Sequence, residues 1–434
     1  MKLEFGYGNG VQIVDIPRKN LLGILQAAPV RHERCGADAV MWALNHPIHA
    51  PMLHQMVRPG QKIAIITSDI SRPLPSYQIL PCVLDELYRA NVLPEDITIV
   101  LALGSHRKHT RDEIIRLVGK ACYETVRCVD SEVTDCIHMG ETSRGTPVDI
   151  TRTVAEADFR ICLGNIEFHY FAGYSGGAKA IMPGVSTPLS IQANHRYMVA
   201  PTACAGRLDG NPVREDLEEA AAICGIDFIV NVVLDEHKKI VFAVAGDMIR
   251  AHRVGCAYLD QMYRRPIPEK ADIVLVSQGG APKDVNLYQT QKALENAKYA
   301  VKDGGTIILI GACQEGMGSE IFSKWLTEAP TPHAMVERIF HDFQLGGHKA
   351  AAIGMVLEKA AVELVSEMDD DFVRSIFLVP RASAQAALDA AFEKYGADAT
   401  VLAMPYGGAT LPFFKEQHDD SRKGHIPCGR QERQ

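Results

Sequence analysis

The chain of 434 residues is too long for one ordinary hydrophobic core, so we expect two α/β domains. A formal net charge of −8 and a pI near 6.1 argue against nucleic acid or an anionic membrane surface as a partner, because both reward clustered lysine and arginine. No run of about 18 apolar residues would span a bilayer, and the start MKLEFGYGNG has no apolar signal core. We therefore expect a cytoplasmic protein.

The cysteine pattern also favours a cytoplasmic protein. The eleven cysteines are scattered, without a C-x-x-C pair or a zinc-ligand spacing. An odd number of dispersed cysteines predicts reduced thiols, most of them buried as small apolar side chains.

Three short apolar runs near the start of the chain predict buried strands, at residues 62–67, 97–103 and 157–163. Polar residues follow each run, and Thr110 with Glu113 predicts a capping box that opens a helix over 111–118. Ligands of open α/β sheets bind in the crevice outside the carboxyl ends of the strands. The polar residues expected to converge there are Asp69, Arg72, His106, Glu167 and His169.

The later chain continues the alternation of helices and strands. The predicted helices are 211–224, 287–298, 335–343 and 350–365, and the predicted strands are 228–234, 240–245, 271–277, 306–311 and 375–380. The two prolines among charges at 263–269 indicate a linker. We therefore predict two doubly wound α/β domains, with the active site in the cleft between them. The expected units are an N-terminal domain at 1–268 that is completed by about 400–420, a C-terminal domain at 269–399 and a polar tail at 421–434.

The segment 165–195 is the densest in groups able to bind or react. Ser175, Gly176 and Gly177 allow close approach to an anion, because no Cβ blocks the backbone. Lys179 follows, and an amine there serves as a point charge or as a nucleophile for covalent attachment. The segment lacks the Gly-Lys-[Ser/Thr] order of a Walker A loop. His195 lies beyond a Pro-Gly break, and a neutral imidazole there is a candidate ligand for a soft transition metal.

This segment closely resembles the corresponding part of the nickel-pincer lactate racemases and their 2-hydroxyacid racemase and epimerase relatives. The resemblance implies a nickel-pincer nucleotide, a nicotinate-derived mononucleotide held by Lys179 through a thioamide. It also implies that His195 completes the coordination of the nickel. Asp69, Ser175, Gly176 and Gly177 are the further candidate cofactor-binding residues.

Two histidines match the general bases of that family. His106 stands in a Gly-x-His-Arg setting, and His169 stands in Glu-Phe-His. Imidazoles with a pKa near 6.5 exchange protons readily at neutral pH, which suits an enzyme that handles either configuration of its substrate. Asp69 and Arg72 form the family's Asp-x-x-Arg-Pro arrangement, in which the arginine forks onto a substrate carboxylate.

The C-terminal domain carries a further match. Tyr288, Gln289 and Lys292 correspond to the Tyr-Gln-x-x-Lys positions that contact the anionic end of the substrate in the family. The Gly-Gly-His-Lys segment at 346–349 is expected to shape the cleft. After it, 350–352 are alanines where lactate-type members carry an aromatic side chain, so the resemblance implies a roomier pocket and a substrate larger than lactate.

The leading hypothesis is a racemase or epimerase that inverts C2 of a small 2-hydroxy acid by hydride transfer to and from the tethered cofactor. It also implies partner proteins that make and load the cofactor. Two alternatives are a nucleotide-dependent phosphotransferase and a non-catalytic, two-lobed protein that binds a small ligand. No nucleic-acid or membrane partner is expected.

Overall fold

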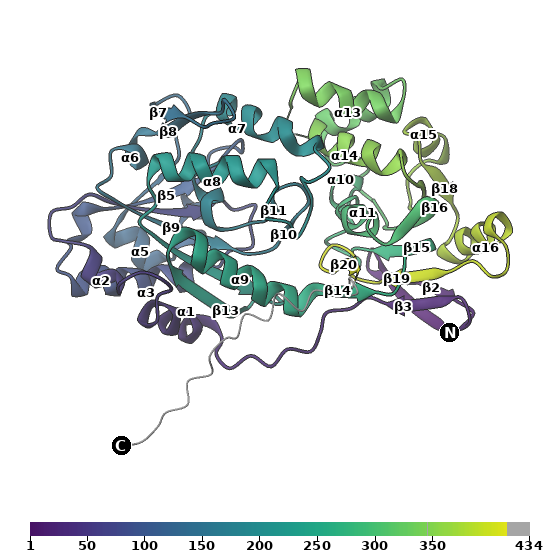
Figure 1. The fold of residues 1–434 in the computed structure, drawn as a ribbon, viewed down its shortest axis with the longest axis horizontal. Coiled ribbons are helices and arrows are strands. Elements are labelled where there is room, and N and C mark those ends of the chain that lie inside the picture. Colours follow the sequence, from purple (N-terminus) through teal and green to yellow (C-terminus); the bar gives the residue numbers. More distant parts are fainter. Residues whose placement is uncertain (345, 415–434) are drawn as a thin grey trace.

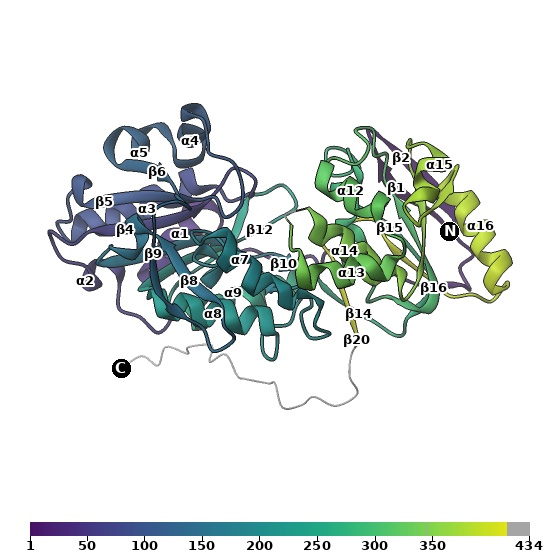
Figure 2. The same cartoon turned by 90° about the horizontal axis from the view of Figure 1, so that it is seen from above.

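The computed structural model describes residues 1–344 and 346–414, so the predicted polar tail at 421–434 lies outside the described residues. Two six-stranded sheets, each covered by helices, form two lobes (Figures 1 and 2). The prediction of two α/β domains is confirmed. No helix in the described residues is long and apolar enough to cross a membrane.

The N-terminal sheet has the strand order β13-β12-β9-β4-β5-β6. Its strands pair in parallel except β12 with β13. The bounds are β4 (Ile63–Ser68), β5 (Ile97–Ala102), β6 (Arg127–Asp130), β9 (Phe159–Asn165), β12 (Phe228–Leu234) and β13 (Ile240–Gly246). The three predicted strands 62–67, 97–103 and 157–163 therefore become neighbours, β5-β4-β9, and their carboxyl ends meet at one edge.

Alternation along these strands sends side chains to two different cores. Ile63 and Ile65 pack with the apolar residues of α1 (Gly36–Asn45) and α3 (Ser76–Arg89), whereas Ala64 and Ile66 pack toward α8 (Pro212–Cys224) and α9 (Met248–Tyr263). A strand buried on both faces reads as a continuous apolar run, which is why the sequence predicts it well. Helix α4 (Arg111–Val118) begins at the predicted capping box of Thr110 and Glu113.

The C-terminal sheet has the order β18-β17-β16-β15-β19-β3, and all its pairs are parallel. The bounds are β3 (Leu21–Ile24), β15 (Ala271–Ser277), β16 (Val301–Ile310), β17 (Ala361–Val365), β18 (Val379–Arg381) and β19 (Val401–Met404). The covering helices are α11 (Lys292–Ala297), α12 (Glu320–Glu328), α13 (Pro332–His341), α14 (Gly347–Leu357), α15 (Asp370–Ser375) and α16 (Ala384–Tyr395).

The first 24 residues lie on this second sheet, which corrects the assignment of residues 1–24 to the N-terminal domain. Strand β3 forms the sheet edge beside β19, and the hairpin of β1 (Lys2–Tyr7) and β2 (Gly10–Asp15) packs over it. In Figure 1 these purple strands lie beside the yellow C-terminal elements. The buried Asp284 carboxylate anchors the hairpin, since its Oδ2 accepts the N–H groups of Gly8 at 2.8 Å and Ala312 at 3.0 Å.

The predicted linker at 263–269 is also different in the structure. Residues Arg264–Ile267 form β14, which pairs in parallel with β20 (Leu411–Phe414). The chain thus crosses back to the second lobe beside its own returning end, after an earlier crossing between β3 and α1.

Two predicted helices are wrong in part. The predicted helix 350–365 ends as α14 at Leu357, and its last five residues are strand β17. Glu363 obscured this strand in the sequence, but Arg381 of β18 donates two hydrogen bonds to its carboxylate, at 2.7 and 3.1 Å. The predicted helix 287–298 breaks at Gln291 into α10 (Leu287–Thr290) and α11. The predicted strand 375–380 is reduced to β18, which follows α15.

Candidate active site

The exposed His106 ring pairs with the buried Asp69 carboxylate at the carboxyl edge of the N-terminal sheet. The Asp69 Oδ2 accepts a hydrogen bond from His106 Nδ1 at 2.7 Å, and its Oδ1 accepts one from the Ser71 hydroxyl at 2.9 Å. Burial opposes ionisation of Asp69, but these hydrogen bonds and the nearby Arg72 outweigh it and lower the pKa of Asp69. Because Nδ1 carries the proton, Nε2 of His106 presents a lone pair.

A second histidine, His109, holds the loop that carries this pair. Its Nδ1 donates to Asp130 Oδ1 at 2.6 Å, and its Nε2 accepts the backbone N–H of Ile70 at 3.0 Å. The loop between β4 and α3 is thereby tied to β6. Nothing in the sequence distinguished the role of His109 from that of its neighbour His106, because both stand in one polar run.

His169 lies beside Lys179 in the adjoining loop. It belongs to the short hairpin of β10 (Phe168–His169) and β11 (Gly173–Tyr174). Its Nδ1 accepts the N–H of Ala172 at 3.3 Å, and its Nε2 lies 3.4 Å from Lys179 Nζ. The neutral ring therefore carries its proton on Nε2, which is the reverse of His106.

Burial lowers the pKa of both side chains in the pair of His169 and Lys179. Burial, with the charges of Lys179 and Arg72, lowers the pKa of His169 well below its ordinary value. Burial also lowers the pKa of Lys179 far below 10.5, and the charges of Arg72 and Arg214 add to the effect. A lowered pKa raises the share of the neutral lysine amine, which is the nucleophile that covalent attachment requires.

The glycine loop before Lys179 is shaped by close packing. Gly176 has φ +75°, and a Cβ at this position would lie 2.7 Å from Asn231 Oδ1. The N–H of Gly177 already donates to that same oxygen at 2.7 Å. Ser175 is engaged as well, because its hydroxyl donates to the carbonyl of Asn165 at 2.7 Å and accepts the N–H of Glu167 at 2.8 Å. A phosphate-binding loop would need the Gly177 N–H and the Ser175 hydroxyl, and these contacts already occupy both groups.

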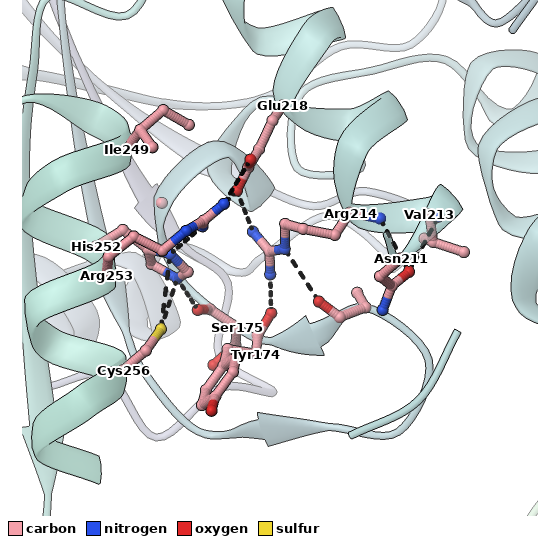
Figure 3. Close-up of polar contacts among 12 residues, drawn as sticks. Tyr174, Ser175, Asn211, Val213, Arg214, Glu218, Ile249, His252, Arg253 and Cys256 are labelled. Carbon is pink, nitrogen blue, oxygen red and sulfur yellow. Dashed lines mark hydrogen bonds and ion pairs between the residues drawn. The ribbon is translucent and has the colours of Figure 1, made fainter. Parts of the chain in front are cut away.

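A fully buried arginine supports the same loop (Figure 3). Arg214 of α8 donates from Nε to the carbonyl of Ala172 at 3.0 Å and from Nη2 to the carbonyl of Tyr174. Glu218 lies 3.6 Å from its Nη1, and Arg253 of α9 binds Glu218 through two hydrogen bonds at 2.8 and 2.9 Å.

His252, which also lies on α9 and is fully buried, is another residue in Figure 3 that supports this loop. Its Nε2 donates to the carbonyl of Ser175 at 2.8 Å. The predicted helix 211–224 located the arginine on a helix, but nothing in the sequence indicated its contact with the loop. Arg214 and His252 are therefore site-shaping residues that the sequence did not reveal.

His195 ends α7 (Pro188–His195) and is 8% exposed. Its ring packs against the edges of two phenylalanines, Phe171 at 4.9 Å and Phe343 at 5.6 Å between centroids. Burial, together with Lys179 and His348, lowers its pKa well below the ordinary value, so the imidazole is neutral at pH 7. A neutral imidazole is the form that binds a metal.

The C-terminal lobe reaches the site through its helix starts, and α7 lies near α13 and α14 in Figure 2. His348 stacks near Tyr170 at 6.4 Å and Phe343 at 5.7 Å between ring centroids. Lys349 Nζ lies 3.5 Å from the Tyr288 ring centroid and donates to the Tyr288 carbonyl at 2.9 Å. Residues 346–349 were expected only to shape the cleft, whereas Lys349 contacts Tyr288, a predicted substrate-binding residue.

Positive charge accumulates where the lobes meet. Burial and the charge of Arg72 lower the pKa of Lys292. Burial and the charge of Lys292 lower the pKa of Lys349 to about 6. Arg72 also influences Tyr288 and His169 electrostatically, so it lies among the predicted residues of both lobes. Cations that repel one another in a buried site favour an anionic ligand.

The remaining predicted substrate residues are less well defined. Gln289 is engaged through its backbone, because its N–H caps α10 at Asn286 Oδ1 and its carbonyl accepts a hydrogen bond from Gln278. Its side-chain role stays a prediction. Ala350, Ala351 and Ala352 are all buried to 1% exposure or less within α14.

Comparison with known proteins agrees with this geometry. The lactate racemase N-terminal domain family matches residues 7–206, and the lactate racemase C-terminal domain family matches residues 267–411. The lactate racemase of Thermoanaerobacterium thermosaccharolyticum is 33% identical over 94% of this chain and 98% of its own length. That of Lactiplantibacillus plantarum is 32% identical over 93% of this chain and 98% of its own length.

Two solved structures resemble the fold. The lactate racemase apoprotein of T. thermosaccharolyticum has a TM-score of 0.86, at 32% identity, and covers 95% of this chain and 100% of its own. A Thermotoga maritima protein shares the fold alone, with a TM-score of 0.64 at 17% identity over 87% of this chain and 98% of its own. With both family models matched in order across nearly the whole chain, the protein belongs to the lactate racemase family, whose named members are isomerases.

Proposed function

We propose that this protein is a racemase or epimerase that inverts C2 of a 2-hydroxy acid, with a nickel-pincer nucleotide attached to Lys179. The observation that carries the proposal is that two differently arranged pairs, His106 with Asp69 and His169 with Lys179, each have a member whose pKa is lowered by the charge of Arg72. The relatedness to lactate racemases supports the reaction class.

The residues present fit such a cofactor. Burial and the charges of Arg72 and Arg214 lower the pKa of Lys179, which favours the neutral amine that a covalent bond requires. His195 supplies one neutral imidazole, and no group of three or more histidine, cysteine or acidic side chains suited to a metal occurs in residues 1–344 and 346–414. A metal at His195 therefore needs most of its ligands from elsewhere, and the sulfurs of a pincer nucleotide meet that need. When bound, the cofactor would accept a hydride from the substrate and return it.

The protein's own residues bind the substrate and move its proton. Arg72 forks onto the carboxylate, and Lys292 approaches the same anionic group from the other lobe. His106 takes the hydroxyl proton at Nε2, while Asp69 holds the ring and stabilises the imidazolium that forms. His169 presents an N–H at Nε2 as donor to the substrate oxygen.

We further propose that the preferred substrate is larger than lactate. The support is the run of alanines 350–352 directly after Lys349, at positions where lactate-type members carry an aromatic side chain. Kinetics on both enantiomers of lactate, malate, 2-hydroxyglutarate, phenyllactate and gluconate test the size preference. A highest kcat/KM for lactate would contradict it and leave the reaction class intact.

Loading requires partner proteins that synthesise and insert the cofactor. The direct test is expression together with such proteins, followed by intact-mass measurement, nickel analysis and an assay of racemisation. The expected result is a covalent adduct on Lys179, one nickel per chain and interconversion of enantiomers. An unmodified chain that still racemises, or a modified chain that transfers phosphate, would overturn the proposal.

A further inference from the structure

A buried polar chain ends at His195. Asp216 of α8 is fully buried and accepts hydrogen bonds from the hydroxyls of Thr142 at 2.5 Å and Thr146 at 2.8 Å. Its Oδ2 also accepts the side-chain N–H of Asn194 at 2.7 Å. The two threonines flank the turn between β7 (Cys136–Glu141) and β8 (Pro147–Thr151), so the chain joins a hairpin, α8 and α7.

This chain fixes which way the Asn194 amide points. Its Nδ2 also lies 3.2 Å from the carbonyl oxygen of Val213, which only accepts. The NH₂ group must therefore face Val213 and Asp216, and Oδ1 faces His195 Nδ1 at 2.9 Å. Because Oδ1 only accepts, His195 carries its proton on Nδ1, and the Nε2 lone pair is left for a ligand.

We propose that Asp216, acting through Asn194, is a positioning residue that holds His195 in the tautomer with Nε2 free to bind a metal. The inference rests on the proposed role of His195 as the metal ligand. Hydrogen-bonded partners behind a ligating histidine orient the ring and set its tautomer, and their loss costs about 10–100-fold in metal affinity. Phe171 and Phe343 restrict the ring from its sides, but they do not select between the two nitrogens.

Asp216→Asn is the sharpest test, because it keeps the volume and introduces a donor where there was an acceptor. The new amide allows Asn194 to turn its oxygen away from His195, and the ring then moves its proton to Nε2. Nitrogen-15 NMR of histidine-labelled protein without cofactor distinguishes the two tautomers, with His195→Gln used to assign the signal. We expect protonated Nδ1 in the unchanged protein and a shift toward protonated Nε2 in the variant.

Metal retention gives the second readout. In the cofactor-loaded variant, nickel should pass to a chromophoric chelator about 10–100-fold faster, while intact mass still shows the adduct on Lys179. Asp227→Asn is the matched control, because this carboxylate is half-buried and accepts the backbone N–H of Arg160 outside the chain that ends at His195. Its tautomer signal and nickel release should equal those of the unchanged protein.

Asn194→Ala removes the acceptor from His195 and leaves Asp216 with its two threonine donors. This variant decides the question if Asp216→Asn does not fold, as judged by circular dichroism melting. An unchanged tautomer together with unchanged nickel release in the folded variants would overturn the inference. Absence of nickel from the unchanged holoprotein would instead contradict the proposed function, and the tautomer measurement would still decide the role of Asp216.

Discussion

The two sides of the candidate site are built in different ways. On the N-terminal side, His106, His169 and His195 each have one ring nitrogen engaged by a named partner, which fixes the protonation of the other. On the C-terminal side, Lys292 and Lys349 come from helix starts, and what they share is an amine whose pKa is lowered by desolvation and by neighbouring cations. The first side is suited to directing protons, whereas the second is suited to holding an anion.

This difference predicts how substitutions will act. A change on the N-terminal side should reduce cofactor loading or kcat, because it removes an atom that would bind the cofactor or transfer a proton. A change on the C-terminal side should raise KM, because it weakens attraction for the carboxylate. The predictions that follow test this division in order of decreasing effect.

Lys179→Ala should abolish both covalent loading and activity, because no other amine is paired with His169. Intact mass and racemase assays measure the two losses, and circular dichroism should show an unchanged fold. Lys179→Arg is the matched control, since it keeps a cation that is not a nucleophile at pH 7. Full activity or a normal adduct in either variant would remove Lys179 from the attachment role.

His106→Asn and His169→Asn should each lower kcat by about 10²–10⁴-fold, the usual contribution of a general acid or base. Both should keep the adduct and the nickel, because neither residue is the proposed attachment or metal ligand. His109→Asn is a useful control, since this histidine lies near His106 but acts on the Ile70 backbone. A loss of kcat in His109→Asn equal to that in His106→Asn would show that loop position, and not proton transfer, limits the rate.

Lys292→Met tests the other side of the comparison. Removing one charged hydrogen bond to the carboxylate should lower kcat/KM by about 10–100-fold, mostly through KM. Lys283→Met is the control, because this lysine is exposed like Lys292 and lies near the same charges of Lys238 and Glu167 but is outside the predicted substrate set. A fall in kcat with unchanged KM would place Lys292 in the chemical step and break the division between the two sides.

The sequence predicted the N-terminal side best where local pattern decides structure. Continuous apolar runs gave β4, β5 and β9, and their order along the chain brought Asp69 and His106 to one edge. The sequence pattern could not show which nitrogen of each histidine is protonated. That depends on hydrogen bonds with the Ala172 N–H and the Asn194 side chain, which form only when the chain folds. Motif resemblance supplied the roles, and the structure supplied the orientations.

Tertiary contacts explain what the sequence did not show. Arg214 and Asp216 are charged residues on the buried side of α8, between the apolar positions 213, 217 and 220. Two charged residues on an otherwise apolar helix face could have been recognised in the sequence as buried polar groups. Their partners could not, because these are backbone carbonyls and threonine side chains far away along the chain. Strand β3 was missed because its half-buried residues at the sheet edge resemble a loop. Its pairing with β19 joins segments separated by most of the chain.

The smallest predicted effect concerns the pH dependence of stability. Burial and the charge of Lys292 lower the pKa of Lys349 to about 6 in the folded protein, from an ordinary value of 10.5. Between these values the unfolded chain binds more protons at this residue than the folded chain does, so its contribution makes the free energy of unfolding rise with pH. Below about pH 6 both states are protonated and the dependence disappears.

Lys349→Met removes this titration and keeps most of the side-chain volume. Urea unfolding of the unloaded protein at pH 6, 7, 8 and 9 should show that the variant is most stabilised relative to the unchanged protein near pH 6. The advantage should shrink with rising pH by at most about 1.4 kcal/mol per pH unit. Lys359→Met, at an exposed lysine, should follow the unchanged protein at every pH. An advantage for Lys349→Met that stays constant between pH 6 and 9 would mean that Lys349 is charged in the folded state, held by the Tyr288 ring and carbonyl. The C-terminal side would then hold a full positive charge before any substrate arrives.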